Sequence, residues 1–158
     1  MLENPSYGWV KIHLRDFCDR ASYLTDVIYD ILEALIHVLN RKGSASVYFD
    51  AEGWEWYIVF TWYETFIIDY PYRTDEEYMN SMDDKPELTV IDMRIEDIAK
   101  EVIKDFEKDY DEWISWNPEG ESEERTKELN KMIDKLKKLI GEEWWMRLII
   151  LLQLIIVL

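Results

Sequence analysis

The sequence is poor in the residues from which most catalytic and metal sites are built: it has one cysteine, two histidines and five glycines. A single cysteine, Cys18, excludes an internal disulfide and indicates a reducing compartment. The histidines, His13 and His37, have no partner at ligand spacing, which argues against a zinc site or a catalytic triad. The glycines are scattered singly, so no phosphate-binding loop is predicted. We expect no metal, no cofactor and no catalytic residue.

Basic residues are also scarce, with 18 lysines and arginines against 34 aspartates and glutamates and a net charge of −16. The excess lies in residues 50–124, where 24 acids stand against 6 bases, whereas the rest of the chain has 10 acids and 12 bases. A field of this sign repels nucleic acid and attracts basic proteins. We therefore expect a basic protein partner and no direct binding of DNA or RNA.

Long apolar runs are missing except at the end of the sequence, and residues 1–11 have neither a basic start nor an apolar stretch. No secretory signal is predicted, so a cytoplasmic location is expected. The chain does have 48% hydrophobic residues, eight tryptophans and ten tyrosines. This composition suits one domain, residues 1–158, with a substantial core.

The predicted fold is a single α+β domain in which two or three long helices cover a mostly antiparallel sheet of four to five strands. Residues 9–14 alternate as in a strand. Residues 15–41 carry apolar side chains at spacings of three and four, which predicts a helix with Cys18 in the core and Gly43 at its C-cap. The other expected elements are a central aromatic sheet, 44–93, two helices within 95–140, namely 95–114 and 123–140, and an apolar tail, 144–158. The first of these helices is expected to carry Glu96 on its outer face. The second is expected to turn five apolar residues inward: Leu129, Met132, Ile133, Leu136 and Ile140.

The central sheet is marked by residues 47–72, of which eleven are aromatic. Alternation along one strand predicts two different faces. The face expected to be buried carries Trp54, Trp56, Ile58, Phe60 and Trp62. The second face carries Glu55, Tyr57, Val59, Thr61 and Tyr63.

The last eleven residues, LIILLQLIIVL, contain one polar side chain, Gln153. As a helix they span about 16 Å, roughly half of a bilayer core of ~30 Å. An element that is apolar on all sides belongs in a core or an interface, so a buried helix or central strand is expected and a membrane partner is not. A tail anchor and a homo-oligomer formed through this segment are the alternatives.

Carboxylates are numerous enough to suggest other functions. Glu55, Asp69 and Asp92 could serve a carboxylate-based hydrolase at strand ends, but their spacing is generic. A second alternative is a nucleic-acid mimic, in which the acids of residues 96–112 and of the sheet imitate phosphates and occupy DNA-binding proteins.

Tryptophans and tyrosines interleave with acids over residues 48–77, a pattern typical of protein-binding surfaces, where aromatic anchors are surrounded by charge. In size and charge, though not in any motif, the chain is similar to the immunity proteins that neutralise basic toxins. The sequence therefore favours a non-catalytic inhibitor of a basic protein. The predicted partner-binding residues are Tyr48, Glu52, Glu55, Tyr57, Tyr63, Asp69, Tyr72, Asp75, Glu76, Glu77, Asp83 and Asp84.

Overall fold

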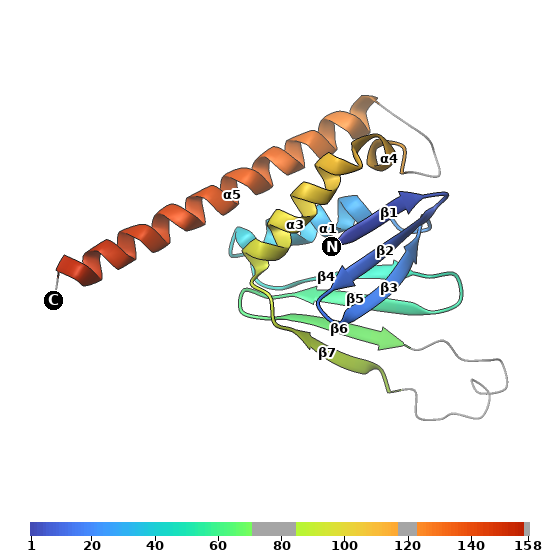
Figure 1. The fold of residues 1–158 in the computed structure, drawn as a ribbon, viewed down its shortest axis with the longest axis horizontal. Coiled ribbons are helices and arrows are strands. Elements are labelled where there is room, and N and C mark those ends of the chain that lie inside the picture. Colours follow the sequence, from blue (N-terminus) through green and yellow to red (C-terminus); the bar gives the residue numbers. More distant parts are fainter. Residues whose placement is uncertain (71–84, 117–122, 157–158) are drawn as a thin grey trace.

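A computed structural model describes the backbone of residues 1–70, 85–116 and 123–156, and the side chains of these residues up to residue 141. The elements are β1 (Leu2–Ser6), β2 (Trp9–Leu14), β3 (Phe17–Ser22), α1 (Val27–Leu39), β4 (Ala45–Asp50), β5 (Glu55–Phe60), β6 (Thr65–Tyr70), β7 (Glu87–Ile91), α3 (Ile95–Lys108), α4 (Tyr110–Ile114) and α5 (Glu123–Ile156). They form a three-stranded antiparallel sheet, β1-β2-β3, and a four-stranded one, β4-β5-β6-β7, with the helices packed against them (Figure 1). The predicted single α+β domain is confirmed, but its strands form two sheets rather than one.

The helix predicted from residue 15 begins only at Val27, and strand β3 replaces its first part. A spacing of four residues, as between Phe17 and Ala21, returns to the same side of a strand as well as to the same side of a helix, so the pattern was ambiguous. Because residue 18 points outward from this strand, Cys18 is exposed rather than part of the core.

Strand β1 has no counterpart in the prediction. Its sequence lacks a clear alternation and includes Pro5, a residue that sheets tolerate at their edges. Asn4 has a φ of 53°, and the register with β2 shifts between Glu3 and Ser6. The strand therefore pairs irregularly along the edge of its sheet, a geometry without a sequence signature.

Helix α1 is closed at both ends by hydrogen bonds. The Asp26 carboxylate accepts one from the backbone N–H of Tyr29 at 3.4 Å, as an N-cap does. At the C-terminus the Lys42 N–H donates to the His37 carbonyl at 3.2 Å, and Arg41 takes a φ of 59°. This is a Schellman motif, so Arg41 holds the left-handed position that the prediction gave to Gly43.

The four-stranded sheet confirms the predicted strands and the predicted buried face. Trp56, Ile58 and Phe60 are fully buried, and the Trp56 ring stacks on Phe49 with centroids 4.3 Å apart. Helix α1 packs on β4 and β5. Strand β3 contacts the same face, where the Phe17 ring centroid lies 5.1 Å from that of Trp56. The core of the domain is therefore built on one side of this sheet.

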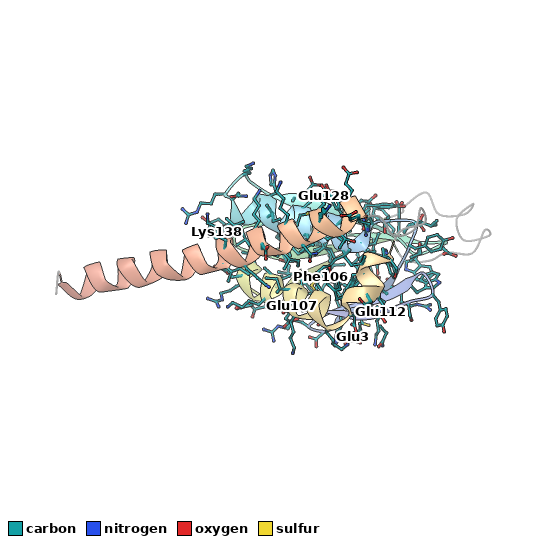
Figure 2. The ribbon with its side chains drawn as sticks, turned by 90° about the horizontal axis from the view of Figure 1, so that it is seen from above. Glu3, Phe106, Glu107, Glu112, Glu128 and Lys138 are labelled. Carbon is teal, nitrogen blue, oxygen red and sulfur yellow. The ribbon has the colours of Figure 1, made fainter. Side chains whose placement is uncertain are left out.

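The helix predicted over 95–114 is divided at Asp109 into α3 and α4, and nothing in the sequence explains the break. After the break α4 carries a fully buried Trp113 to within 5.4 Å of the Trp116 ring. Glu96, which was expected on the outer surface of the helix, is buried. Seen from above, Glu107 of α3 and Glu112 of α4 lie on the same side of α5 (Figure 2).

Helix α5 buries Leu129, Ile133 and Leu136, as the sequence predicted. It does not end at Gly141 but continues to Ile156, and its C-terminal part extends away from the rest of the molecule (Figure 1). The strand alternative for the apolar tail is therefore wrong, while the expected burial of its side chains lies outside the described residues. In the part of the chain that the structure describes, no helix is long and apolar enough to cross a membrane.

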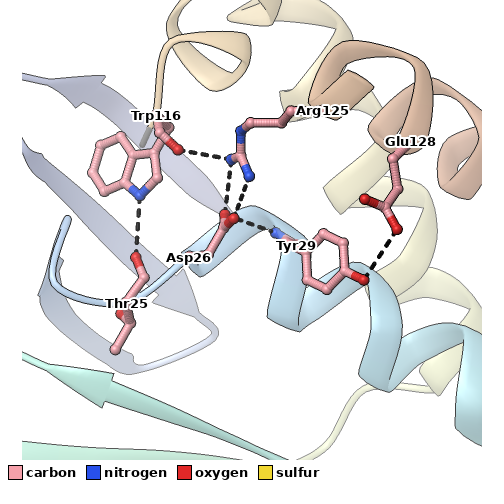
Figure 3. A network of polar contacts seen from close by, with 6 residues as sticks. All are labelled: Thr25, Asp26, Tyr29, Trp116, Arg125 and Glu128. Atoms are coloured by element: carbon pink, nitrogen blue, oxygen red, sulfur yellow. Dashed lines mark hydrogen bonds and ion pairs between the residues drawn. The ribbon is translucent and has the colours of Figure 1, made fainter. Parts of the chain in front are cut away.

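An ion pair between buried Arg125 on α5 and half-buried Asp26 joins α5 to the start of α1 (Figure 3). Arg125 is only 9% exposed and donates to both carboxylate oxygens of Asp26, at 2.8 Å for one of the two bonds. It also donates to the Trp116 carbonyl at 2.7 Å, and the Trp116 indole donates to the Thr25 carbonyl at 3.3 Å. One guanidinium thus ties together the N-cap of α1, the end of α4 and the start of α5.

Candidate protein-binding surface

The four-stranded sheet has a second face, which we call the outer face. Its side chains alternate with those of the core face, which we call the inner face. Registered pairing across the four strands shows which residues belong to it. The outer face carries Ser46, Tyr48, Asp50, Glu55, Tyr57, Val59, Phe66, Ile68, Tyr70, Leu88 and Val90.

A row of apolar side chains crosses all four strands on the outer face. Tyr48 lies opposite Tyr57, Tyr57 opposite Ile68, and Ile68 opposite Leu88. The rings of Tyr48 and Tyr57 are 5.3 Å apart, and that of Tyr70 follows at 6.2 Å from Tyr57. These centroid spacings are typical of favourable aromatic pairs, so the tyrosines form one continuous surface.

In the described part of the chain, several residues of the outer face are exposed to solvent. Leu88 is 64% exposed and Val90 55%, and Tyr48 and Tyr70 are also exposed. The rings of Tyr48 and Tyr70 contact Tyr57, and Tyr48 also hydrogen-bonds to Glu55, so these contacts stay within the outer face. An exposed apolar sheet face of this kind usually marks an interaction site or an aggregation risk.

Two carboxylates stand directly opposite each other at one end of the outer face. Asp50 on β4 pairs in register with Glu55 on β5, and Tyr70 on β6 lies on the other side of Glu55. Neither carboxylate forms an ion pair with a lysine or arginine in the described ranges. Asp50 accepts only a backbone hydrogen bond, from Glu52 at 2.7 Å in the adjoining turn. Like charges in this position repel, so the pair lowers the stability of the sheet.

Burial and the neighbouring acids raise the pKa of Tyr48 and of Tyr57. Burial raises the pKa of Tyr48, and the neighbouring charges of Asp50 and Glu55 raise it further. The pKa of Tyr57 is raised for the same reasons, burial first and then Glu55. Both phenols therefore remain neutral hydrogen-bond donors in the negative field of the two acids.

Of the residues predicted from sequence, the structure brings Tyr48, Glu55 and Tyr57 together on the outer face, with Glu52 in the β4–β5 turn beside them. Tyr63 lies in the β5–β6 turn at the opposite end of the strands, 88% exposed, where it lines a hollow of about 460 Å³ with Arg41 and Trp62. Tyr63, which the sequence placed on the same face as Glu55 and Tyr57, therefore lies apart from them.

Asp69 belongs to the inner face, since it pairs with Trp56. Burial raises its pKa, and Asp19 and Glu87 add to the effect. Its buried Oδ1 has no hydrogen-bond partner among the residues that can be described. Because it points away from Glu55, it is not part of the outer surface.

The remaining predicted residues fall in one segment, and they lie outside the described residues: Tyr72, Asp75, Glu76, Glu77, Asp83 and Asp84. The three acids considered for a hydrolase do not converge. Glu55 and Asp69 are on opposite faces, and Asp92 follows β7 at the far end of the sheet. Within the described part of the chain, no three His, Cys, Asp or Glu side chains are grouped so that they could hold a metal ion.

Sequence reasoning missed Asp50, Tyr70, Leu88 and Val90 as members of the surface. Each lies within the sheet region that the sequence predicted, at a position whose side chain alternates onto the outer face. What was lacking was the register between strands, because only pairing decides which alternating set of one strand joins which set of the next. In β7 the sequence shows only that Leu88 and Val90 alternate with Glu87 and Thr89, and this alternation does not say which set faces outward.

Comparison with known proteins adds no relative: no family model, curated protein or solved structure matches this chain.

Proposed function

We propose that this chain is a non-catalytic acidic protein that docks through its outer face on a basic protein and inhibits it, as immunity proteins do with basic toxins. The observation that carries the proposal is the outer face itself. It joins exposed apolar and aromatic residues to two unpaired carboxylates, in the part of the chain that holds the excess negative charge. Aromatic anchors supply affinity in such interfaces, and the field of the acids accelerates association.

The helical acids favour this proposal over nucleic-acid mimicry. A phosphate mimic needs free carboxylates in a row, whereas those of α3 are engaged within the chain. Asp97 pairs with Arg94 at 2.8 Å and with Lys100 at 3.0 Å, and the Arg94 hydrogen bond lowers its pKa to about 2. Other pairs join Glu107 to Lys137 and Asp109 to Lys108.

The test is binding to a panel of basic nucleases at low and at physiological salt, with wild type and two matched variants. Leu88→Asp places a charge on the outer face. Leu24→Asp makes the same change at an exposed leucine in the β3–α1 loop. We expect one tight partner, an affinity loss of about tenfold or more for Leu88→Asp, and no loss for Leu24→Asp.

Two results would contradict the proposal. The first is the absence of binding to every basic protein of the panel at low salt. The second is equal affinity of Leu88→Asp and wild type, which would move the interface away from the outer face. Binding to many unrelated DNA-binding proteins with a steep loss in salt would instead indicate mimicry.

A further inference from the structure

One part of the outer face combines rings and charge, and we call it the acid–tyrosine corner: Tyr48, Asp50, Glu55, Tyr57 and Tyr70. The five side chains come from three adjacent strands, in two neighbouring rows of the same face. Rows on one face are about 7 Å apart along a strand, and registered partners about 5 Å apart across it. A single side chain of a partner is long enough to touch both rows.

The acid–tyrosine corner holds two like charges, Asp50 and Glu55, opposite each other. Asp50 and Glu55 face each other without a basic partner in the described structure, although their repulsion costs stability. An incoming cation would relieve this repulsion and gain two carboxylate contacts. Charge complementarity therefore requires a positively charged group as the occupant.

We infer that the anchor of the partner is an arginine rather than a lysine, an inference that rests on the proposed docking of the outer face. A guanidinium is planar, stacks on aromatic rings and donates two parallel hydrogen bonds to one carboxylate. The tyrosines supply the rings: Tyr48 and Tyr57 at 5.3 Å, and Tyr57 and Tyr70 at 6.2 Å. A lysine ammonium is compact and strongly hydrated, so it gains the charge contact but little from the rings.

The experiment compares two labelled peptides of alternating glycine with arginine or with lysine, which carry the same charge. Wild type is expected to bind the arginine peptide about fivefold more tightly, because only that peptide uses the rings. Tyr57→Leu removes the central ring and should abolish this preference. Glu55→Gln should weaken binding of the arginine peptide about tenfold.

The matched control is Glu64→Gln, which removes one exposed acid from the β5–β6 turn at the other end of the strands. A loss equal to that of Glu55→Gln would reduce the effect to net charge and overturn the inference. Equal binding of both peptides to wild type would also overturn it, while leaving a basic partner in place. An arginine preference that survives in Tyr57→Leu would place the site elsewhere, and absence of binding by either peptide would contradict both this inference and the proposed function.

Discussion

The inner and outer faces of the β4–β7 sheet are both rich in aromatic and aliphatic residues, but they differ in burial. On the inner face Trp56, Ile58 and Phe60 are fully buried under α1 and β3. On the outer face aromatic and aliphatic residues remain exposed, and two like charges stand opposite each other. The inner face stabilises the domain, whereas the outer face includes a repulsive pair of acids and is the surface that we propose for a partner.

The largest expected effect is a difference in stability between variants at two neighbouring positions of β5. Trp56→Ala removes a fully buried side chain whose indole also donates to the Arg20 carbonyl at 2.9 Å, so the free energy of unfolding should fall by about 4 kcal/mol. Tyr57→Ala, one residue further on the outer face, should cost about 1 kcal/mol or less. Urea unfolding of both variants measures the difference, and similar losses would erase the distinction between the faces.

The next effect concerns the helical layer that covers the inner face. Arg125→Met leaves the carboxylate of Asp26 without its guanidinium partner and should lower the free energy of unfolding by about 3 kcal/mol. Lys127→Met is the matched control, because the Lys127–Glu123 pair on the same helix is exposed. Its loss should stay below about 0.5 kcal/mol. Thermal or urea unfolding tests the pair of variants. An equal loss in both would show that the Arg125–Asp26 pair stabilises the fold no more than an exposed pair does.

A smaller effect depends on pH. Burial, followed by the charge of Asp26, raises the pKa of Asp30 on α1 to about 6. A raised folded pKa means that the full stability is present below the unfolded value of ~4 and is lost as the pH rises through about 6. Asp30→Asn should therefore stabilise the protein at neutral pH by about 1 kcal/mol, after allowance for partial solvent screening, and by little at pH ~4.

The control for this prediction is Asp134→Asn, which makes the same substitution on the exposed side of α5. Unfolding free energies of both variants across this pH range provide the measurement. A constant difference between Asp30→Asn and wild type would show that folding does not raise the pKa of Asp30.

The smallest expected effect is a gain in stability, and it comes from a substitution on the outer face. Glu55→Gln removes the repulsion with Asp50 and should raise the free energy of unfolding by about 0.5 kcal/mol at low ionic strength. The same substitution weakens the proposed binding of an arginine. Urea unfolding at low and high salt should show the gain only at low salt, and a loss of stability instead would reveal a favourable contact of Glu55 within the chain.

The sequence predicted the parts of the fold in which neighbouring residues have clearly different surroundings. Alternation from Trp54 to Trp62 separated the two faces correctly, and the apolar stripe of α5 identified Leu129, Ile133 and Leu136 as buried. Local pattern failed where two periodicities agree, as in the segment that became β3. It also failed for the irregular strand β1 and for the end of α5, where Gly141 is accommodated inside the helix at a cost of about 1 kcal/mol.

For the candidate site, local pattern identified Tyr48, Glu55 and Tyr57, but it also included Asp69, which faces the core. The surface is a property of four strands in register, and one strand read alone cannot show which residues of the next lie beside it. For the proposed partner, complementarity with the outer face restricts the charge and the anchoring side chain.

The central claim is that the outer face is exposed in the part of the chain that the structure describes, residues 1–70, 85–116 and 123–156. The most direct measurement is the free energy of unfolding of the double variant Leu88→Asp/Val90→Asp, which places two charges among its exposed apolar residues. The account predicts a change within about 1 kcal/mol of wild type, as for surface substitutions. A loss of more than about 3 kcal/mol, as expected for buried charges, would show that the face is covered and would contradict the account.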